Sequence, residues 1–520
     1  FGDGCIIADF GELFRPSLTV RVNPARLLHW TSGQVLCSIR MSYIEHIIGI
    51  ALAVLYWLFT AVVTFRVIGR RNPVSVTLSW LLVIYILPFV GALLYLMLGE
   101  LNLGRQRARR AEAMLEPFLA SIAEDFKTQK APLPGGQLVQ GIRQLIETRL
   151  GIGALGYQQM DLLETPEQIF DRLCQDVREA KSSIHLETYI WFPGGRIDTL
   201  SEALIDAAGR GVQVSLLIDH AGSRPFFRSR WRKRFIDAGI EVVPALPVRL
   251  WRALAQRVDL RLHRKLVVID GHIAYTGSMN MADPSHFKKE ANVGQWVDIM
   301  LRLDGPAARG LDKVFAWDWE VETGIRRLAP APPSPPTCYK WLSILPSGPG
   351  MGEDLITQAV LSSIYRANES ITISTPYFVP SEAIFDALCQ AARRGVRVKV
   401  LVPERNDSHL VGWASRAYYE RFLEAGGSIY LFRGGLLHTK AMLMDGQLAL
   451  VGSVNLDIRS LQLNFELTVP LFSPEGCAVI KRLLDGYISD SVELDLAQWR
   501  QRSRGARVLE RLMFFLSPLL

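Results

Sequence analysis

The sequence predicts an α/β protein in which two pseudo-symmetric domains, each a mixed sheet flanked by helices, follow a two-helix transmembrane hairpin. Three observations support this fold class. Two long uncharged apolar runs precede residue 100. From about residue 150, strand-like and helix-like segments alternate, which is typical of layered α/β domains. The second part of this region repeats the first in order and spacing, which indicates a duplication.

The predicted hairpin consists of residues 47–65 and 74–99, which are uncharged over 19 and 26 residues. At about 1.5 Å per residue, each run can cross a hydrocarbon core of about 30 Å. The alternative is a pair of buried helices in a soluble domain, but two successive runs without a polar face disfavour it. Pro88 lies inside the second run, where a membrane helix tolerates it better than a soluble one. The link between the two runs contains three arginines and the segment after the second run contains four, so charge hardly determines the orientation of the hairpin.

The remaining boundaries follow from composition. Residues 1–40 show no sustained periodicity and precede the first methionine, Met41, so we expect a non-native or disordered extension there. Residues 329–336 read APAPPSPP, which is typical of a stiff linker. The expected order is an extension at 1–40, the hairpin within 41–104, a linker region at 105–150, a first domain at 151–328, the proline-rich linker at 329–336, and a second domain with a basic C-terminal segment at 337–520.

Internal similarity supports two related domains of some 180 residues each. Three segments recur in the same order, and chance similarity between two strand–helix units does not explain their constant separation. The paired segments are SIHLETYI (183–190) with SITISTPY (370–377), GVQVSLLI (211–218) with GVRVKVLV (395–402), and FIDAG (235–239) with FLEAG (422–426).

A further repeated motif carries the chemistry. Both copies fit H-x-K-x4-D-x6-G-S-x-N without a gap, and two matching copies in corresponding places are a strong signal. The first copy contains His263, Lys265, Asp270, Ser278 and Asn280, and the second contains His438, Lys440, Asp445, Ser453 and Asn455.

The residue types indicate phosphoryl chemistry. Positions i and i+2 of a strand face the same way, so each His and Lys should project together. If the halves pair about a pseudo-twofold axis, one imidazole can attack phosphorus and the other can protonate the leaving oxygen. Lysine, serine and asparagine donors suit the phosphate and its transition state, and no metal is required. We expect no cofactor.

Four carboxylates accompany the motifs. Asp270 and Asp445 belong to the motif and are assigned to the catalytic set with it, although their position at strand ends also suits structural turns. Glu290 and Glu466 follow the two histidines by 27 and 28 residues. A carboxylate there could orient each imidazole, while the alternative is a solvated strand charge.

The duplicated motif resembles the signature of the phospholipase D superfamily. Within it, the chain looks like the bacterial cardiolipin synthases of the two-membrane-helix type, and the likeness covers Met41 to Leu520. The supporting stretches are LLVIYILPFVGALLYLMLGELNLG (81–104), DWEVETG (318–324), STPYFVP (374–380) and RLMFFLSPLL (511–520). The resemblance implies two phospholipase D-like domains, a phosphatidyl-histidine at His263, and His438 as acid and then base. Lys265, Lys440, Asn280 and Asn455 would bind the phosphate.

The family reaction would join two phosphatidylglycerols into cardiolipin and release glycerol. We therefore expect phosphatidylglycerol and anionic membrane lipids as partners, no nucleic acid, and a bacterial inner-membrane location with the catalytic domains in the cytoplasm. A lipid hydrolase, another phosphatidyltransferase or a nuclease would share the motifs, but a nuclease would not need two spans. A non-catalytic membrane binder is disfavoured by two intact motifs. The basic segment before Leu512 could lie on an anionic surface or serve as an ordinary docking helix.

Overall fold

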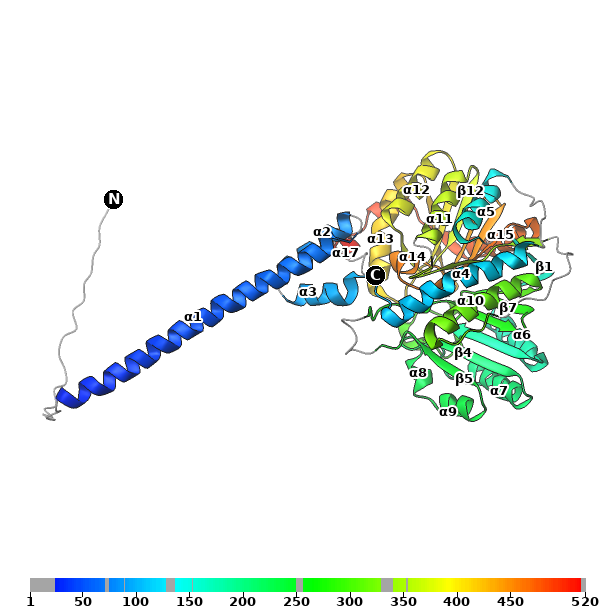
Figure 1. The fold of residues 1–520 in the computed structure, drawn as a ribbon. Helices are drawn as coiled ribbons and strands as arrows, with labels where there is room; N and C mark the ends of the chain where they lie inside the picture. The colour runs from blue at the N-terminus through cyan, green and yellow to red at the C-terminus, as the bar shows by residue number, and fades with distance from the viewer. Residues whose placement is uncertain are drawn as a thin grey trace, which may run out of the picture. The chain divides into compact units, whose positions relative to one another are not determined.

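The computed structural model describes residues 24–70, 74–87, 89–127, 136–151, 153–248, 256–328, 340–351 and 354–515. The chain forms two compact units, Phe1–Gly99 and Glu100–Leu520, each described by itself (Figure 1). Residues 1–23, Pro88 and the proline-rich linker at 329–336 lie outside the described residues, so the expectations for them stay predictions.

Among the described residues of the first unit, one helix is long and apolar enough to cross a membrane. Helix α1 (Pro24–Ile68) has 45 residues, and its spanning part is Tyr43–Ile68. Because α1 begins at Pro24, residues 24–40 are helical, although the sequence showed no periodicity there. The exposure of its apolar side chains fits a helix whose partner is lipid rather than protein.

The second apolar run is not a single helix, so the predicted hairpin is only partly present. The run divides into α2 (Val74–Ile86), α3 (Val90–Leu94) and a π-helical turn, η1 (Tyr95–Gly99). Phe89 has a left-handed φ of 60°, which ends the helical path. Gly91 then packs on the backbone of Val83, where an added Cβ would lie 2.2 Å from the carbonyl oxygen. Only glycine allows this close return of α3 onto α2.

The second unit contains two mixed sheets, one from each half of the repeat. The smaller sheet has the order β2 (Gln159–Leu163), β9 (Met300–Asp304), β7 (Ile273–Gly277), β6 (Leu266–Ile269), β3 (Ser183–Thr188), β4 (Gln213–Asp219) and β5 (Glu241–Ala245). The larger has the order β1 (Leu155–Tyr157), β10 (Lys340–Leu342), β20 (Glu466–Leu471), β18 (Leu448–Gly452), β17 (Ala441–Met444), β12 (Ser370–Ser374), β14 (Arg397–Pro403), β15 (Ser428–Phe432) and β21 (Ser491–Glu493), with β11 (Leu345–Ser347) also on β20.

The two sheets share one topology, as the internal repeat predicted. The path β9-β7-β6-β3-β4-β5 of the first corresponds to β20-β18-β17-β12-β14-β15 of the second. In both, the last three strands are parallel and the others antiparallel. The predicted mixed α/β class is therefore confirmed.

Helices cover the sheets. Those of the first half are α6 (Pro166–Glu179), α7 (Arg196–Gly209), α8 (Arg224–Phe227), α9 (Arg230–Asp237) and α10 (Pro306–Thr323). Those of the second half are α11 (Leu355–Arg366), α12 (Glu382–Arg393), α13 (His409–Glu424), α14 (Ile458–Gln462), α15 (Pro474–Ser489), α16 (Leu496–Arg500) and α17 (Arg504–Phe515). Thirteen of the 18 residues of α10 are buried, because the helix packs on the first sheet and also on α4 and β1.

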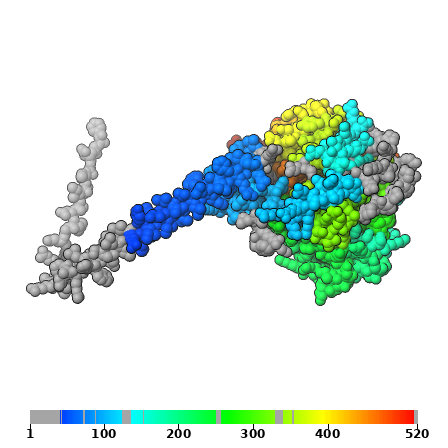
Figure 2. Space-filling view, viewed as in Figure 1, coloured from blue at the N-terminus to red at the C-terminus, as the bar shows by residue number. Residues whose placement is uncertain are grey.

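The region expected to be a linker is part of the core. Helix α4 (Arg105–Lys127) packs on α10, and α5 (Gln137–Leu150) packs on α11. Met114, Phe118 and Ile142 are fully buried in the same cluster as α10. Figure 2 shows α4, in blue-cyan, lying where the green first half meets the yellow second half. Strand β1 also crosses the expected boundary, because it precedes the first sheet in sequence but pairs with β10 of the second.

Candidate active site

Each motif histidine stands at the end of a segment that pairs with the opposite half. Leu262 forms a parallel bridge with Phe465, and the His263 amide donates to the Phe465 carbonyl at 2.9 Å. In the second half, β16 (Leu436–Leu437) pairs with β8 (Trp296–Val297), and the His438 amide donates to the Val297 carbonyl at 2.9 Å. The halves thus exchange equivalent contacts about a pseudo-twofold axis, and the two motifs meet in one place.

Both imidazoles are held by carboxylates from the opposite half. His263 Nδ1 lies 2.8 and 2.9 Å from the two oxygens of Glu466, and His438 Nδ1 lies 2.7 Å from Asp298 Oδ1. All four side chains are buried. A carboxylate accepts the Nδ1 proton, so Nε2 of each ring is left as the atom that can attack or transfer a proton. This is the orienting arrangement of a catalytic triad.

The sequence identified Glu466 but chose the wrong partner for the other histidine. Glu290 is exposed on the short helix η3 (Lys289–Ala291), and Asp298 occupies the position equivalent to Glu466. Asp298 follows Asn280 by 18 residues, whereas Glu466 follows Asn455 by 11. A longer loop in the first half therefore shifts the carboxylate, and equal spacing after the histidines was misleading.

The two lysines lie beside the histidines, as strand periodicity predicted. Lys265 Nζ donates to the His263 carbonyl at 2.7 Å, and Lys440 Nζ donates to the His438 carbonyl at 2.5 Å. Burial lowers the pKa of Lys265 to about 8, and burial together with the charge of Lys265 lowers that of Lys440 to about 7. Each ammonium has further protons to offer a ligand.

Burial also has the largest effect on the pKa values of the two histidines. It lowers the pKa of both His263 and His438 to about 4, against the opposing pull of Glu466 and Asp298. Each lysine lowers the pKa of the opposite half's histidine as well as its own, as expected when both lysines lie close to both imidazoles. Asp298 stays ionised, because His438 and Lys440 outweigh its burial and bring its pKa to about 2. An unliganded site therefore holds two neutral imidazoles and two ammonium groups, and the ammonium groups can bind an anion.

The motif serines form hydrogen bonds with other groups of the protein. Ser278 Oγ accepts from the Ile299 amide at 3.0 Å, and Ser453 Oγ accepts from the Leu467 amide at 2.9 Å. Ser453 also donates to Glu466 at 2.5 Å. These contacts fasten the segment that carries each carboxylate. The geometry gives the serines a positioning role in place of the substrate contact expected from sequence.

The motif asparagines are buried and keep hydrogen-bonding capacity. Asn455 Nδ2 donates to Ser460 Oγ at 3.1 Å. Oδ1 of Asn280 and Oδ1 of Asn455 have no partner among the described residues. A buried amide without a full set of partners is costly unless a ligand or water completes it. The unpartnered Oδ1 atoms can accept from a hydroxyl group of a bound molecule, whereas a contact with a phosphate oxygen must come from Nδ2.

The motif aspartates are structural, so their assignment to the catalytic set was wrong. Asp270 accepts from the amides of Lys181, Ser182 and Ser183 at 2.7–2.9 Å, and Asp445 accepts from those of Asn368, Glu369 and Ser370 at 2.8 Å. Each lies in a left-handed turn with φ 51°, at the end of its strand farthest from the histidine. Aspartate tolerates this conformation and its carboxylate fixes the start of β3 or β12.

A buried ionic layer behind His263 was missed from the sequence. Arg264, between the motif His and Lys, is fully buried; it donates to the Glu466 carbonyl at 3.0 Å and forms an ion pair with Asp318. Glu187 is also fully buried beside Asp318, and burial and the charge of Asp318 raise its pKa well above the usual range.

The second half replaces this layer with hydroxyl groups. Thr439, equivalent to Arg264, donates to the Val297 carbonyl at 3.2 Å and contacts the Tyr487 hydroxyl at 3.0 Å. Ser374, equivalent to Glu187, donates to the Thr439 carbonyl at 3.0 Å. The only signal in the sequence was the difference between H-R-K and H-T-K, which gives no indication of burial.

Aromatic rings line the site. Tyr189 contacts His263 edge-on with ring centroids 5.0 Å apart, and Trp296 contacts His438 at 4.5 Å. In the part of the chain that the structure describes, no cluster of three or more His, Cys, Asp or Glu could hold a metal ion. The groups that can meet a ligand are thus two imidazoles, two ammoniums and two amides.

Comparisons with known proteins agree with this geometry. A family model described as "Cardiolipin synthase, PLD-like domain" matches residues 173–319 and 360–487, and one described as "Phospholipase D-nuclease N-terminal" matches residues 54–100. The chain is 48% identical over 472 residues to cardiolipin synthase A of Cronobacter sakazakii, covering 89% of this chain and 97% of that one. It is 47% identical over 472 residues to cardiolipin synthase A of Klebsiella pneumoniae, with the same coverage.

A solved structure shows the same fold. The phosphatidylserine synthase of Haemophilus influenzae superposes with a TM-score of 0.56 at 14% identity, and the match covers 73% of this chain and all of that one. At this identity the likeness concerns the fold alone. The family models and the relatives establish that the chain belongs to the cardiolipin synthase family of the phospholipase D superfamily.

Proposed function

We propose that the chain is a phosphatidyltransferase that transfers a phosphatidyl group from one phosphatidylglycerol to another, releases glycerol and forms cardiolipin. The observation that supports this most is the reciprocal pairing of His263 with Glu466 and His438 with Asp298. Two equivalent, oriented imidazoles on either side of one phosphate can share a double displacement, with one as nucleophile and the other as proton carrier.

In the first half-reaction, Nε2 of His263 attacks the donor phosphorus. A P–N bond forms, the P–O bond to glycerol breaks, and protonated His438 gives its proton to the departing glycerol oxygen. The ammonium groups of Lys265 and Lys440 lie where negative charge gathers on the phosphoryl oxygens, and the amides of Asn280 and Asn455 add neutral contacts. Glu466 stabilises the positive charge that develops on His263.

In the second half-reaction, neutral His438 takes the proton of a hydroxyl group on the acceptor phosphatidylglycerol. The oxygen attacks phosphorus, the P–N bond breaks, and His263 recovers its lone pair while His438 ends protonated. One phosphodiester replaces another, so atoms and charge balance. Water in place of the acceptor would give phosphatidic acid.

Binding of the anionic substrate allows His438 to take up a proton from solvent. In the unliganded site burial and two ammonium groups keep the pKa of both histidines at about 4. A phosphodiester anion bound between them adds negative charge beside both rings and raises the pKa of both imidazoles. One proton can then be held between the pair, while repulsion opposes a second.

The proposed substrate lies in a membrane, and the chain can be anchored there. Tyr43–Ile68 can cross a membrane, and a lipid phosphate lies at the surface of that membrane. We place the chain in the bacterial inner membrane as a multi-pass protein, with its catalytic unit on the cytoplasmic side and anionic lipids as its partners. Three free cysteines buried in the catalytic unit accord with a reducing compartment.

The test is reconstitution of the full chain in phosphatidylglycerol vesicles with analysis of all products. We expect cardiolipin and free glycerol in equal amounts, and loss of both in His263→Ala and His438→Ala. Glu290→Gln, at the exposed carboxylate, is the matched control and should retain activity. Phosphatidic acid as the main product would instead make the chain a hydrolase, and turnover that survives both histidine changes would refute the mechanism.

A further inference from the structure

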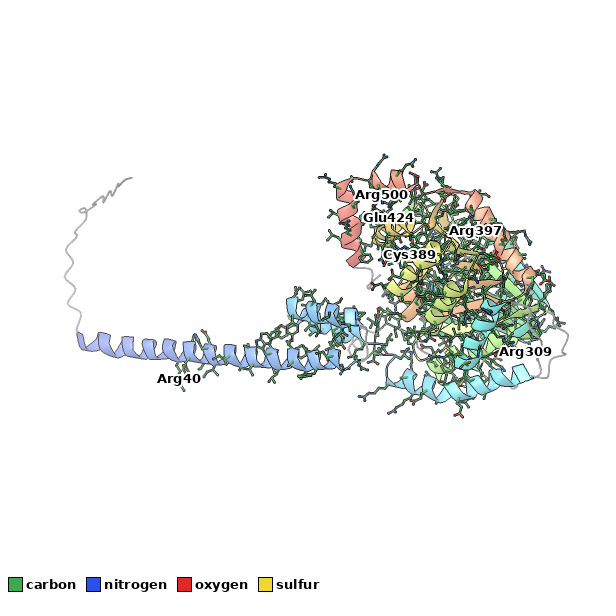
Figure 3. The ribbon with its side chains drawn as sticks, turned by 90° about the horizontal axis from the view of Figure 1, so that it is seen from above. Arg40, Arg309, Cys389, Arg397, Glu424 and Arg500 are labelled. Carbon is green, nitrogen blue, oxygen red and sulfur yellow. The ribbon has the colours of Figure 1, made fainter. Side chains whose placement is uncertain are left out.

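Helix α17 is a fixed part of the catalytic unit. It packs along α13, where the Phe514 and Tyr418 rings lie 5.3 Å apart. Glu510 on the packed face is 4% exposed and forms an ion pair with Arg502 at 3.1 Å. Figure 3 shows α17 at the edge of the unit, near labelled Arg500 and Glu424, which form a further ion pair at 2.5 Å between α16 and α13. The helix is therefore held in place through one face, and its other face has a fixed direction.

The outer face of α17 is apolar in one sector. Val508 and Leu512 lie four residues apart, so they stand on the same side of the helix, and they are 58% and 55% exposed. Of the ten large apolar side chains that are exposed in the described part of Glu100–Leu520, four belong to α13 and α17, including Phe514 and Leu410. This clustering marks an interaction surface.

The adjoining sector is basic. Arg504, Arg507 and Arg511 follow one another at spacings of three and four residues, so they form a row beside Val508 and Leu512. None of the three forms an ion pair with any residue that the structure describes. Glu510, the one acidic residue of the helix, is buried with Arg502 and does not offset the row. The outer face thus combines unneutralised positive charge with exposed aliphatic groups.

We propose that the outer face of α17 docks on an anionic lipid bilayer, with Val508 and Leu512 in the acyl–headgroup boundary and the arginine row on lipid phosphates. This rests on the proposed function, in which substrate and product are both anionic lipids. A basic row beside an apolar stripe is the pattern of a helix that lies in a membrane interface. A second copy of the chain fits less well, because a twofold contact would bring the two arginine rows together. The docked helix would orient the catalytic unit on the lipid surface.

The test uses the full chain with His263→Ala, so that the lipid composition stays constant during measurement. Cys5, Cys37 and Cys338 are replaced by serine, and a polarity-sensitive fluorophore is attached at Leu512→Cys. The control carries the same label at Tyr365→Cys on α11, an aromatic side chain that is 50% exposed. Vesicles contain nitroxide-bearing lipids as quenchers and either phosphatidylglycerol or only zwitterionic lipid.

We expect strong quenching and a blue-shifted emission at position 512 on anionic vesicles, little at 365, and weaker quenching at 512 on zwitterionic vesicles. Arg504→Gln, Arg507→Gln and Arg511→Gln together should lower the docking equilibrium about 100-fold, at roughly fivefold for each charge. Arg228→Gln, Arg232→Gln and Lys233→Gln remove the same charge from the first half and should leave it unchanged.

A label at 512 that behaves like the label at 365 would overturn the proposal, as would equal quenching on both vesicle types. Quenching lost equally in both triple variants would overturn the assignment to α17. The readout does not depend on turnover, so its failure would leave the proposed reaction untouched, and failure of the reaction would leave this result interpretable.

Discussion

Glu466→Gln tests the role of the carboxylate that orients His263. The two oxygens of Glu466 lie 2.8 and 2.9 Å from Nδ1 in a buried pair, and Ser453 and Asn464 also donate to them. Glutamine keeps the size and one acceptor but removes the charge. Charges about 4 Å apart interact by about 4 kcal/mol at an effective dielectric constant of about 20. The neutral imidazole of the resting state feels little of this, whereas the positively charged ring of the transition state and intermediate feels most of it.

The expected loss therefore falls on the rate of the chemical step. At about 1.4 kcal/mol for each factor of ten, kcat should drop about 1000-fold while KM changes little. The assay is cardiolipin formation by the full chain in phosphatidylglycerol vesicles, with Glu290→Gln as a control that makes the same chemical change at an exposed site. A loss below tenfold for Glu466→Gln, or an equal loss for Glu290→Gln, would refute the reasoning.

Three further predictions concern charge and structure. Burial and Lys265 lower the pKa of Lys440 to about 7, so its ammonium is present below that pH and lost above it. The KM for phosphatidylglycerol should therefore rise between about pH 7 and 9. A KM that does not change over this range would contradict the prediction. Asp270→Ala removes the acceptor of three amides, which should lower the free energy of unfolding by about 1–3 kcal/mol and reduce Tm. At low temperature, kcat should change less than about threefold. A loss of kcat at unchanged Tm would instead support a catalytic role for Asp270. Arg264→Met leaves Asp318 without its buried partner, and such losses cost about 3–5 kcal/mol. Glu187→Gln should lower Tm much less, because burial raises the pKa of Glu187 and so favours its neutral form. Equal Tm values for the two variants would argue against the ionic layer.

The sequence predicted the architecture of the catalytic unit because the duplication repeats local patterns. Alternating strands and helices specify the mixed sheets, and strand periodicity places each motif lysine beside its histidine. The sequence also predicted that the two motifs converge, because two copies of one motif in one chain imply a twofold arrangement. These features depend on short-range spacing, which a single sequence contains.

Features that depend on loop length and long-range packing could not be predicted. Asp298 reaches His438 through a loop that has no counterpart of equal length in the second half, so counting from the histidine pointed to Glu290. Hydropathy alone could not show that the second apolar run breaks near Phe89, because the break depends on a left-handed residue and on the close packing of Gly91 against Val83. The burial of Arg264 depends on Asp318, which lies 54 residues away.

The central claim, that His263 carries the phosphatidyl group and His438 moves the proton, is tested most directly by trapping the intermediate. A phosphatidyl donor whose leaving group is 4-nitrophenolate needs no acid, so His438→Ala should still complete the first half-reaction and then stall for lack of a base. We expect a burst of nitrophenolate stoichiometric with the chain and, after digestion, a peptide that contains His263 and carries the phosphatidyl group, with neither in His263→Ala. A burst and adduct in His263→Ala but none in His438→Ala would contradict it.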